Sequence, residues 1–485
     1  MNTQPDIRNG DLHSAGPLGY NESAALARDL ERVCALSADA AARLRELSGH
    51  RAYRLARLLC RVRHGLPDLR ESDPLYPVIC SLESCAAFSA DTRRAREQAI
   101  RRLLESWRSE TVFVFLETVD WDIPLFQRPQ QMALALGRMG LPVFYGTPNG
   151  RDRVSGPALR GPNCVLLPWD GAETALRLAK DCGKKTVLGL CSTDMIHTLA
   201  DLDRLRRYAD QLLYEYIDAL SEDISGPIGA EIRRRHEVLL SDPAVFIVAT
   251  ADALYRHAVT LRGSAQRCLC SGNGVDTAHF AAVRDPSGLT PELAAVLDVP
   301  RPVIGYFGAL ASWFDYELVA RAAKERPGYD FVLLGERYDS PGSRGLASLA
   351  GRKNVRWAGP VPYEQLPHAA AFFTAAMIPF VRNEVTLATS PIKLFEYMAL
   401  GKPVVSTDLP ECRKEPLALI ARDGAEFIRA LDTALARSRD PSFVKKLREA
   451  AAENSWGAKA RQIARFLGIQ DRAAGPKGET DAFPV

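Results

Sequence analysis

The chain has 485 residues, 47% of them hydrophobic and 25% charged, which is enough for two or three domains with full-sized cores. Its formal net charge of +3 is too small to favour a nucleic-acid partner. The 10 cysteines form no C-x-x-C pair, the first residues have no apolar core, and no apolar run reaches about 18 residues. These features favour a cytoplasmic protein without disulfides, zinc, a signal peptide or a membrane span.

Residues 1–110 are expected to form a helical N-terminal extension. Apolar positions recur at helical spacing within residues 22–47 and 93–108. Residues 51–64, between them, are rich in arginine and contain no acid. A basic helix of this kind can lie on an anionic membrane surface or contact another protein, and it can equally be a solvated helix packed on its neighbours. The sequence leaves these alternatives open.

A new pattern begins at Thr111, where apolar runs alternate with helical segments. Residues 111–119 predict a buried strand, a polar and aromatic loop follows, and a helical pattern leads to a second strand over residues 142–146. This order opens a Rossmann-like domain, which we expect to extend over residues 111–285. Asp218 follows another predicted strand, so it either faces a cleft or caps the next loop.

The loop after the first predicted strand carries side chains that could reach a substrate. Asp120 and Asp122 are two residues apart, a spacing that can hold a divalent cation against a diphosphate. We favour the alternative in which this loop lines one side of a cleft, because a segment downstream suits a diphosphate without a metal.

A second alternating region follows a proline-containing linker, and we expect it to form a Rossmann-like domain over residues 300–440. Strands are predicted over residues 377–380 and 403–406. Between them a helix is expected to open near Ser390, since Pro391 suits the first helical turn.

The start of this predicted helix would lie at the carboxyl edge of a parallel sheet, where N–H groups and the helix dipole favour phosphate. Lys393 and Glu396 are three residues apart and share a helix face there. A cation near a diphosphate and a carboxylate that accepts ribose hydroxyls would suit a nucleotide-sugar site. An ordinary surface Lys–Glu pair is the alternative that the spacing leaves open.

The segment SPIKLFEYMALGKPVVSTDLPE, residues 390–411, resembles the donor-binding segment of GT-B fold glycosyltransferases of group 1, family four. The pattern from Trp121 to Gln131 and the run Trp313-Phe314-Asp315 are most similar to the teichuronic-acid-type subgroup. The resemblance implies an α/β GT-B fold, with two Rossmann-like domains that face each other across a cleft. It also implies that helices within residues 441–468 return to the first domain, ahead of a disordered tail over residues 469–485.

The function implied by the resemblance is transfer of a sugar from a nucleoside diphosphate sugar to an acceptor hydroxyl. The acceptor would be a saccharide, a lipid-linked sugar or a small molecule in surface polysaccharide or glycoconjugate biosynthesis. Asp120, Gln127 and Arg128 would face this acceptor, with Arg128 either binding an anionic acceptor or bracing the loop. Transfer would retain the anomeric configuration, and neither a metal nor another cofactor would be needed. The enzyme would work in the cytoplasm, at the inner face of the membrane if residues 51–64 bind there. The residues implied in catalysis are Asp120, Arg128 and Lys393, and those implied in donor binding are Gly308, Gly335, Glu336, Val361, Pro362, Arg382, Ser390, Lys393 and Glu396.

The sequence departs from the family pattern at three positions. Two cations that family members place on the diphosphate are replaced by Ala309 and Phe314, and a family glutamate is replaced by Ala388. The diphosphate charge then has to be matched by Lys393, the helix N-terminus and Arg382. Two alternatives stay open at this point, a nucleotide-sugar epimerase on the same fold and a non-catalytic nucleotide-binding scaffold.

Overall fold

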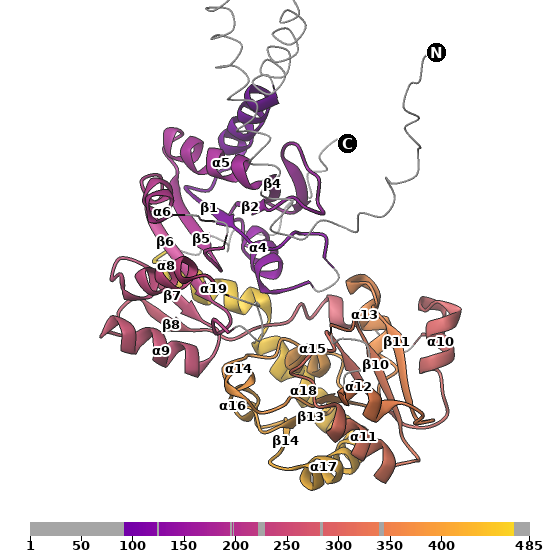
Figure 1. Cartoon of the computed structure of the whole chain (residues 1–485). Coiled ribbons are helices and arrows are strands. Elements are labelled where there is room, and N and C mark those ends of the chain that lie inside the picture. The colour runs from indigo at the N-terminus through magenta and orange to yellow at the C-terminus, as the bar shows by residue number, and fades with distance from the viewer. Residues whose placement is uncertain are drawn as a thin grey trace, which may run out of the picture.

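The computed structural model describes residues 92–469, apart from residues 124–125, 195, 197, 222–227, 282–284 and 339–343. Within these residues the chain forms two α/β domains, each built on its own sheet (Figure 1). Of the helix expected over residues 93–108, residues 92–106 are helical. The helix expected within residues 22–47, the basic segment 51–64 and the tail beyond Ile469 lie outside the described residues. No described helix is long and apolar enough to cross a membrane.

The sheet of the first domain has eight strands in the order β3-β4-β2-β1-β5-β6-β7-β8. All neighbouring strands pair in parallel except β3, which runs antiparallel to β4 at one edge. Parallel strands covered on both faces are apolar throughout, and all 6 residues of β1 are buried. The strands are β1 (Thr111–Leu116), β2 (Val143–Thr147), β3 (Ala158–Gly161), β4 (Cys164–Pro168), β5 (Lys185–Leu190), β6 (Gln211–Tyr216), β7 (Phe246–Ala249) and β8 (Cys268–Cys270).

Two helical layers cover the faces of this sheet. Successive residues of a strand point to opposite faces, so Val112 and Val114 pack in one core cluster and Phe113 and Phe115 in another. The first cluster includes residues of helix 92–106, α5, α6, α8 and α9, and the second includes residues of α4 and α19. The labelled helices are α4 (Arg128–Arg138), α5 (Trp169–Asp181), α6 (Leu199–Arg206), α8 (Ala230–Ser241), α9 (Asp252–Arg262) and α19 (Trp456–Phe466).

The sheet of the second domain has six parallel strands in the order β11-β10-β9-β12-β13-β14. Its strands are β9 (Val303–Phe307), β10 (Asp330–Leu334), β11 (Val355–Gly359), β12 (Ala375–Ile378), β13 (Val404–Thr407) and β14 (Leu419–Ala421). Its helices are α10 (Pro291–Leu297), α11 (Tyr316–Glu325), α12 (Arg344–Leu349), α13 (Leu366–Ala370), α14 (Glu384–Leu387), α15 (Lys393–Ala399), α16 (Pro410–Arg413), α17 (Gly424–Arg437) and α18 (Pro441–Glu453). Short 3₁₀ turns lie at η1 (His279–Ala281), η2 (Pro286–Gly288) and η3 (Tyr363–Gln365).

The last two helices connect the domains. Helix α18 contacts α15 of the second domain, whereas α19 contacts α4 of the first. Trp456 and Ile463 of α19 are buried in the same cluster as Met132 of α4. In Figure 1 the yellow α19 accordingly lies among the magenta elements of the first domain. The C-terminal end of the described chain therefore completes the core of the first domain.

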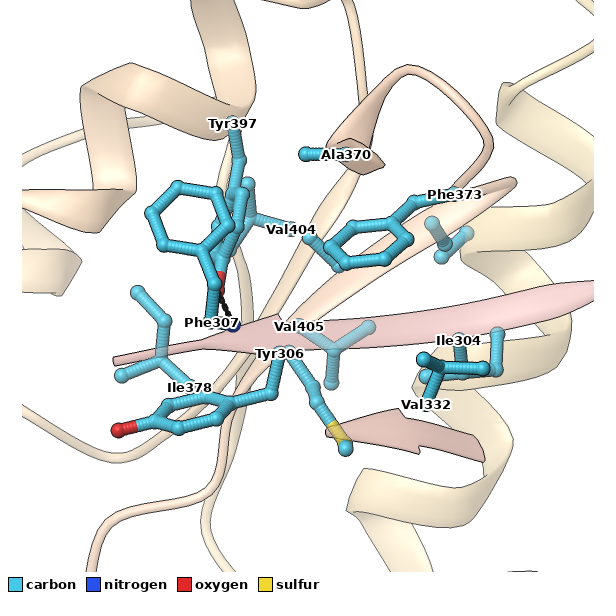
Figure 2. Packing of buried hydrophobic residues seen from close by; sticks show 14 of the residues in the cluster. Ile304, Tyr306, Phe307, Val332, Ala370, Phe373, Ile378, Tyr397, Val404 and Val405 are labelled. Atoms are coloured by element: carbon cyan, nitrogen blue, oxygen red, sulfur yellow. Dashed lines mark hydrogen bonds between the residues drawn. The ribbon is translucent and has the colours of Figure 1, made fainter. Parts of the chain in front are cut away.

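The core beneath the second domain's site is closely packed around β9 (Figure 2). The fully buried Tyr397 of α15 accepts a hydrogen bond from the backbone N–H of Phe307 at 2.9 Å through its hydroxyl. This bond ties α15 to the end of β9. Further along the strand, the ring of Phe373 covers Gly305 so closely that a Cβ there would lie 2.2 Å from ring carbons.

The structure differs from the sequence-based boundaries at a few elements. Strand β12 lies two residues earlier than expected, because Ala375 and Ala376 are the residues that pair with β9. Helix α15 begins at Lys393, not near Ser390, because Ile392 is its N-cap and Pro391 lies in the preceding turn. The β3–β4 hairpin and the short α14, which is closed by a capping box, were not predicted.

Replacing Gly305 with alanine should destabilise the protein, because the new methyl group overlaps the Phe373 ring. Overpacking of this kind typically costs about 1–3 kcal/mol of unfolding free energy. Gly156→Ala is the matched control, since no atom lies within 4 Å of its Cβ position. Urea unfolding of both variants measures the effect, and equal stabilities would contradict the packing described here.

Candidate active site

A cavity of about 690 Å³ lies between the two domains. Clefts of this size accommodate nucleotide-sized ligands and occur preferentially between domains. Phe126, Gln127 and Arg128 line it from the first domain, together with the loop after β6. Asn273 lines it from the connection between the domains. The other wall is formed by the carboxyl ends of second-domain strands and the start of α15.

Lys393 and Glu396 both line this cavity, as their spacing suggested. Glu396 is buried and Lys393 partly buried in the first turn of α15. Burial raises the pKa of Glu396 to about 7, against the opposing effect of the Lys393 charge. Burial likewise lowers the pKa of Lys393, while Glu396 acts in the opposite direction. Each charge is therefore poorly solvated and only partly compensated by the other, so both are available to a polar ligand.

The position of Lys393 is fixed by aromatic rings. Its Nζ lies 5.5 Å from the ring centre of Tyr306 and 5.2 Å from that of Phe380. Among the described residues Nζ has no hydrogen-bonding or ion-pair partner. Of the described residues that line the cavity from the second domain, Lys393 is the one cation. The ammonium is consequently held in place by ring faces and left free to bind an anion.

Gly308 and Gly335 form a tight corner of the cavity wall, at the ends of β9 and β10. Gly308 has φ +132° and Gly335 φ +148°, a region that side-chain-bearing residues rarely adopt. A Cβ on Gly335 would lie 1.9 Å from the carbonyl oxygen of Gly308, and one on Gly308 would lie 3.1 Å from Cε of Lys393. Glycine at both positions lets backbone lie directly against a ligand beside Lys393.

The remaining donor-site candidates separate into two groups. Val361, Glu336 and Ser390 line the cavity, whereas Pro362 and Arg382 are not among its lining residues. The guanidinium of Arg382 forms an ion pair with Asp408 at 3.5 Å, outside the cavity. The structure therefore does not bring Arg382 to Lys393, although the sequence offered both as cations for a diphosphate.

The acceptor-side candidates also separate. Gln127, Arg128 and Asp218 line the cavity, but Asp120 does not. The buried Asp120 accepts a hydrogen bond from the Thr147 hydroxyl at 2.9 Å and so joins the loop after β1 to the end of β2. The structure thus places the loop beside the cleft, as expected, and its aspartate behind the cavity wall.

Arg128 is buried at the first position of α4, with an exposed fraction of 2%. Its Nε donates a hydrogen bond to Glu215 of β6, and its Nη1 donates to the carbonyl of Gly272 at 3.1 Å. Its Nη2 has no hydrogen-bond partner among the residues that the structure describes. These contacts show that Arg128 braces the loop, while one buried donor remains unused in the wall of the cavity.

An aromatic contact closes one end of the cavity across the domains. The ring of Phe126 lies 4.9 Å from that of Tyr363, and the ring of His279 stacks on Tyr363 at 4.3 Å. The Tyr363 hydroxyl is hydrogen-bonded to Nε2 of Gln131 in α4 at 2.6 Å. The sequence did not indicate this role for Tyr363, since an aromatic residue in a loop carries no distinguishing pattern.

The three positions that depart from the family pattern lie in different surroundings. Ala309 lines the cleft, and Phe314 is buried with ring centres of Tyr306 and Tyr316 each 4.8 Å away. Ala388 packs in the core cluster of the first domain. Restoring bulky charged side chains at Phe314 or Ala388 would therefore place charge in an apolar contact.

The two aspartates considered as metal ligands are engaged differently. Asp120 bonds Thr147, whereas the exposed Asp122 lies 3.6 Å from Arg160. Among the described residues no group of three or more His, Cys, Asp or Glu side chains is arranged to hold a metal ion.

A second polar cluster, which the sequence analysis missed, lies at the carboxyl edge of the first sheet. Glu117 directly follows β1 and accepts a hydrogen bond from the thiol of Cys191, which follows β5. Burial raises the pKa of Glu117 to about 8; the Cys191 hydrogen bond opposes this and the charge of Glu215 adds to it. A charged residue directly after a wholly apolar strand was the signal that could have identified it.

Comparison with known proteins identifies the chain. The family model described as glycosyl transferases group 1 matches residues 301–437. A putative teichuronic acid biosynthesis glycosyltransferase, TuaH of Bacillus subtilis, is 26% identical over 279 residues, which cover 54% of this chain and 68% of that protein. The chain is a glycosyltransferase, and its residues 301–437 match the group 1 family.

Solved structures share the fold of this glycosyltransferase. Sucrose-phosphate synthase from Thermosynechococcus elongatus is 18% identical with a TM-score of 0.53, over 74% of this chain and 98% of that one. Anabaena Alr3699/HepE in complex with UDP and glucose is 14% identical with a TM-score of 0.54, over 74% and 100% of the two chains. The predicted GT-B fold and the predicted glycosyltransferase family are confirmed.

The buried carboxyl of Glu117 makes stability depend on pH. The folded glycosyltransferase binds a proton with a pKa of about 8 where the group's ordinary value is 4.5, so the folded state holds more protons than the unfolded state between these values. The free energy of unfolding should therefore fall as pH rises through this window, by up to about 1.4 kcal/mol per pH unit from this group.

Glu117→Gln should remove that contribution, so that the stability of the variant relative to wild type increases from pH 5 to about pH 8. Urea unfolding at several pH values measures the difference. Asp122→Asn is the control, because it exchanges a carboxylate for an amide at an exposed position. A difference between Glu117→Gln and wild type that stays constant with pH would show that Glu117 is ionised in the folded protein.

Proposed function

We propose that this glycosyltransferase moves a sugar from a nucleoside diphosphate sugar to a hydroxyl of a saccharide or lipid-linked acceptor, with retention and without a metal, in surface polysaccharide or glycoconjugate biosynthesis. The observation that carries the proposal is the pair Lys393 and Glu396, which share one wall of an interdomain cavity. Arg128, Gln127 and Asp218 line that cavity from the first domain. Donor and acceptor would thus bind on opposite walls.

The donor fits the second-domain wall by its chemistry. A diphosphate would lie against Lys393 and the backbone at Gly308, where no side chain intervenes. The ribose hydroxyls would donate to the Glu396 carboxylate, less than one helical turn further on. The base would lie toward Gly335 and Val361, which line the cavity at the ends of β10 and β11.

Lys393 would also assist the reaction. As the sugar leaves, negative charge develops on the diphosphate, and a fixed cation in a poorly solvated site stabilises it more effectively than water does. This role of a side-chain cation is the basis for proposing transfer without a metal. Retention is carried over from the family resemblance.

The comparisons support the substrate classes. The related Bacillus subtilis protein is named for teichuronic acid biosynthesis, and the Anabaena structure holds UDP and glucose. We therefore propose a nucleotide sugar as the donor substrate of this chain and a polysaccharide as its product.

Lys393→Ala should weaken binding of nucleoside diphosphates about 10- to 100-fold, the effect of losing one charge-assisted contact of roughly 1.5–3 kcal/mol. Binding of the corresponding nucleoside should change little, since it lacks the phosphates. Isothermal titration with UDP, GDP, ADP and dTDP, each in EDTA and in Mg²⁺, measures both affinities and identifies the base.

Arg382→Ala is the matched control, because this cation lies outside the cavity in an ion pair with Asp408. It should bind nucleoside diphosphates as wild type does. Unchanged affinity in Lys393→Ala would refute its phosphate role, and binding that requires Mg²⁺ would refute the metal-free site.

The raised pKa of Glu396 predicts a pH-dependent donor affinity. With a pKa of about 7, the carboxyl of the unliganded protein is largely protonated below neutrality, and it accepts two ribose hydroxyls only after losing that proton. Nucleoside diphosphate affinity should therefore fall as pH decreases from 8 to 6. In Glu396→Gln the affinity should be weaker and should lose this dependence, and an identical pH profile in variant and wild type would exclude Glu396 as the titrating group.

A further inference from the structure

The connection between the domains, residues 271–275, meets the start of the donor helix at Asn273. The backbone N–H of Asn273 donates to the Ser390 hydroxyl at 3.1 Å. Its side-chain Nδ2 donates to the Ser390 carbonyl at 2.7 Å. Ser390 lies three residues before Lys393, so both bonds act where the chain enters α15.

The same side chain also meets the wall of the first domain. Its Oδ1 accepts from Nη1 of Arg128 at 3.4 Å, and that nitrogen also donates to the Gly272 carbonyl. The amide is thus oriented by its partners, since the oxygen faces a cation and the nitrogen faces a carbonyl. A carboxylate would repel the Ser390 carbonyl, and an aliphatic side chain would satisfy neither partner.

The junction leaves little room for adjustment. A Cβ on Gly272 would lie 3.1 Å from the Ser390 hydroxyl, and one on Gly274 would lie 2.8 Å from the carbonyl of Asn454. Val275 is hydrogen-bonded on both sides, to Asn454 at 3.1 Å and Trp456 at 3.0 Å. Because its neighbours are fixed, Asn273 holds Arg128 and the start of α15 at a defined distance from each other.

We infer that Asn273 is a positioning residue, which sets the donor held by Lys393 and Glu396 against the acceptor wall at Arg128 and Gln127. The inference rests on the proposed donor site. It adds the requirement that the donor wall is correctly placed relative to the acceptor wall. Donor binding depends mainly on the second domain, whereas transfer depends on the placement of one wall relative to the other. A misplacement of about 1 Å can reduce a reaction rate by about 100-fold without loss of binding.

The test compares the turnover rate with the nucleotide affinity of two variants, Asn273→Ala and Asn273→Asp. UDP-, GDP-, ADP- and dTDP-glucose are first compared with the wild-type protein, and the donor that is turned over fastest is used for the variants. The rate of nucleoside diphosphate release gives kcat. We expect kcat to fall about 10- to 100-fold in both variants. The dissociation constant of the matching nucleoside diphosphate should stay within about threefold of wild type, since the second-domain contacts remain.

Asn454→Ala is the matched control, because its side chain lies at the same junction but, among the described residues, is hydrogen-bonded to Ala450 and Lys459 of the last two helices instead of to either wall of the cavity. It should retain kcat, and thermal unfolding of all variants verifies that they are folded. Wild-type kcat in Asn273→Ala, or restoration of kcat by Asn273→Asp, would overturn the inference. So would a loss of nucleotide affinity equal to the loss of rate. If the proposed donor site itself is wrong, nucleotide affinity will be the same in Lys393→Ala and wild type, and this outcome is distinct from those of the Asn273 variants.

Discussion

The buried guanidinium of Arg128 is the contact on which the arrangement of the cleft depends. It takes partners from β6 and from the interdomain connection, and it lies 5.9 Å from the ring centre of Trp456 at the start of α19. A charge so far from water is tolerated only when it is paired and hydrogen-bonded, so each of these segments is held where Arg128 requires it. The wall of the first domain is thus defined by one residue that the acceptor would also meet.

The opposite wall, formed by the second domain, contains few charged side chains among the described residues that line the cavity. Where the family resemblance implied two further cations, this chain has a small residue in the cleft and an aromatic residue in the core, Ala309 and Phe314. Lys393 is left to act from within a frame of aromatic rings, beside a carboxyl group whose pKa is raised by burial. Weak solvation increases the effect of each remaining charge, which offsets the small number of charges.

Much of this architecture was predictable from the sequence, for identifiable reasons. Continuous apolar runs such as residues 111–116 give buried parallel strands, and the spacing of Lys393 and Glu396 gives a shared helix face. What the sequence could not provide was the partner of each side chain across long separations. Arg382 was a plausible phosphate ligand until its pairing with Asp408 was seen, and Asp120 a plausible cleft residue until it was found bonded to Thr147. The β3–β4 hairpin was missed because its edge strand is short and only partly buried, so it lacks the apolar run that identified the others.

The two crossings between the domains lie side by side. The chain leaves the first domain at residues 271–275 and returns to it at residues 454–456, and Val275 is hydrogen-bonded to both ends of the returning segment. Two crossings at one place constrain motion differently from two crossings far apart. A swing of the domains about this point would leave the bonds of Val275 intact, whereas a sliding motion would break them. The two crossings therefore form one hydrogen-bonded junction, and an opening of the cleft by rotation about it would keep these bonds.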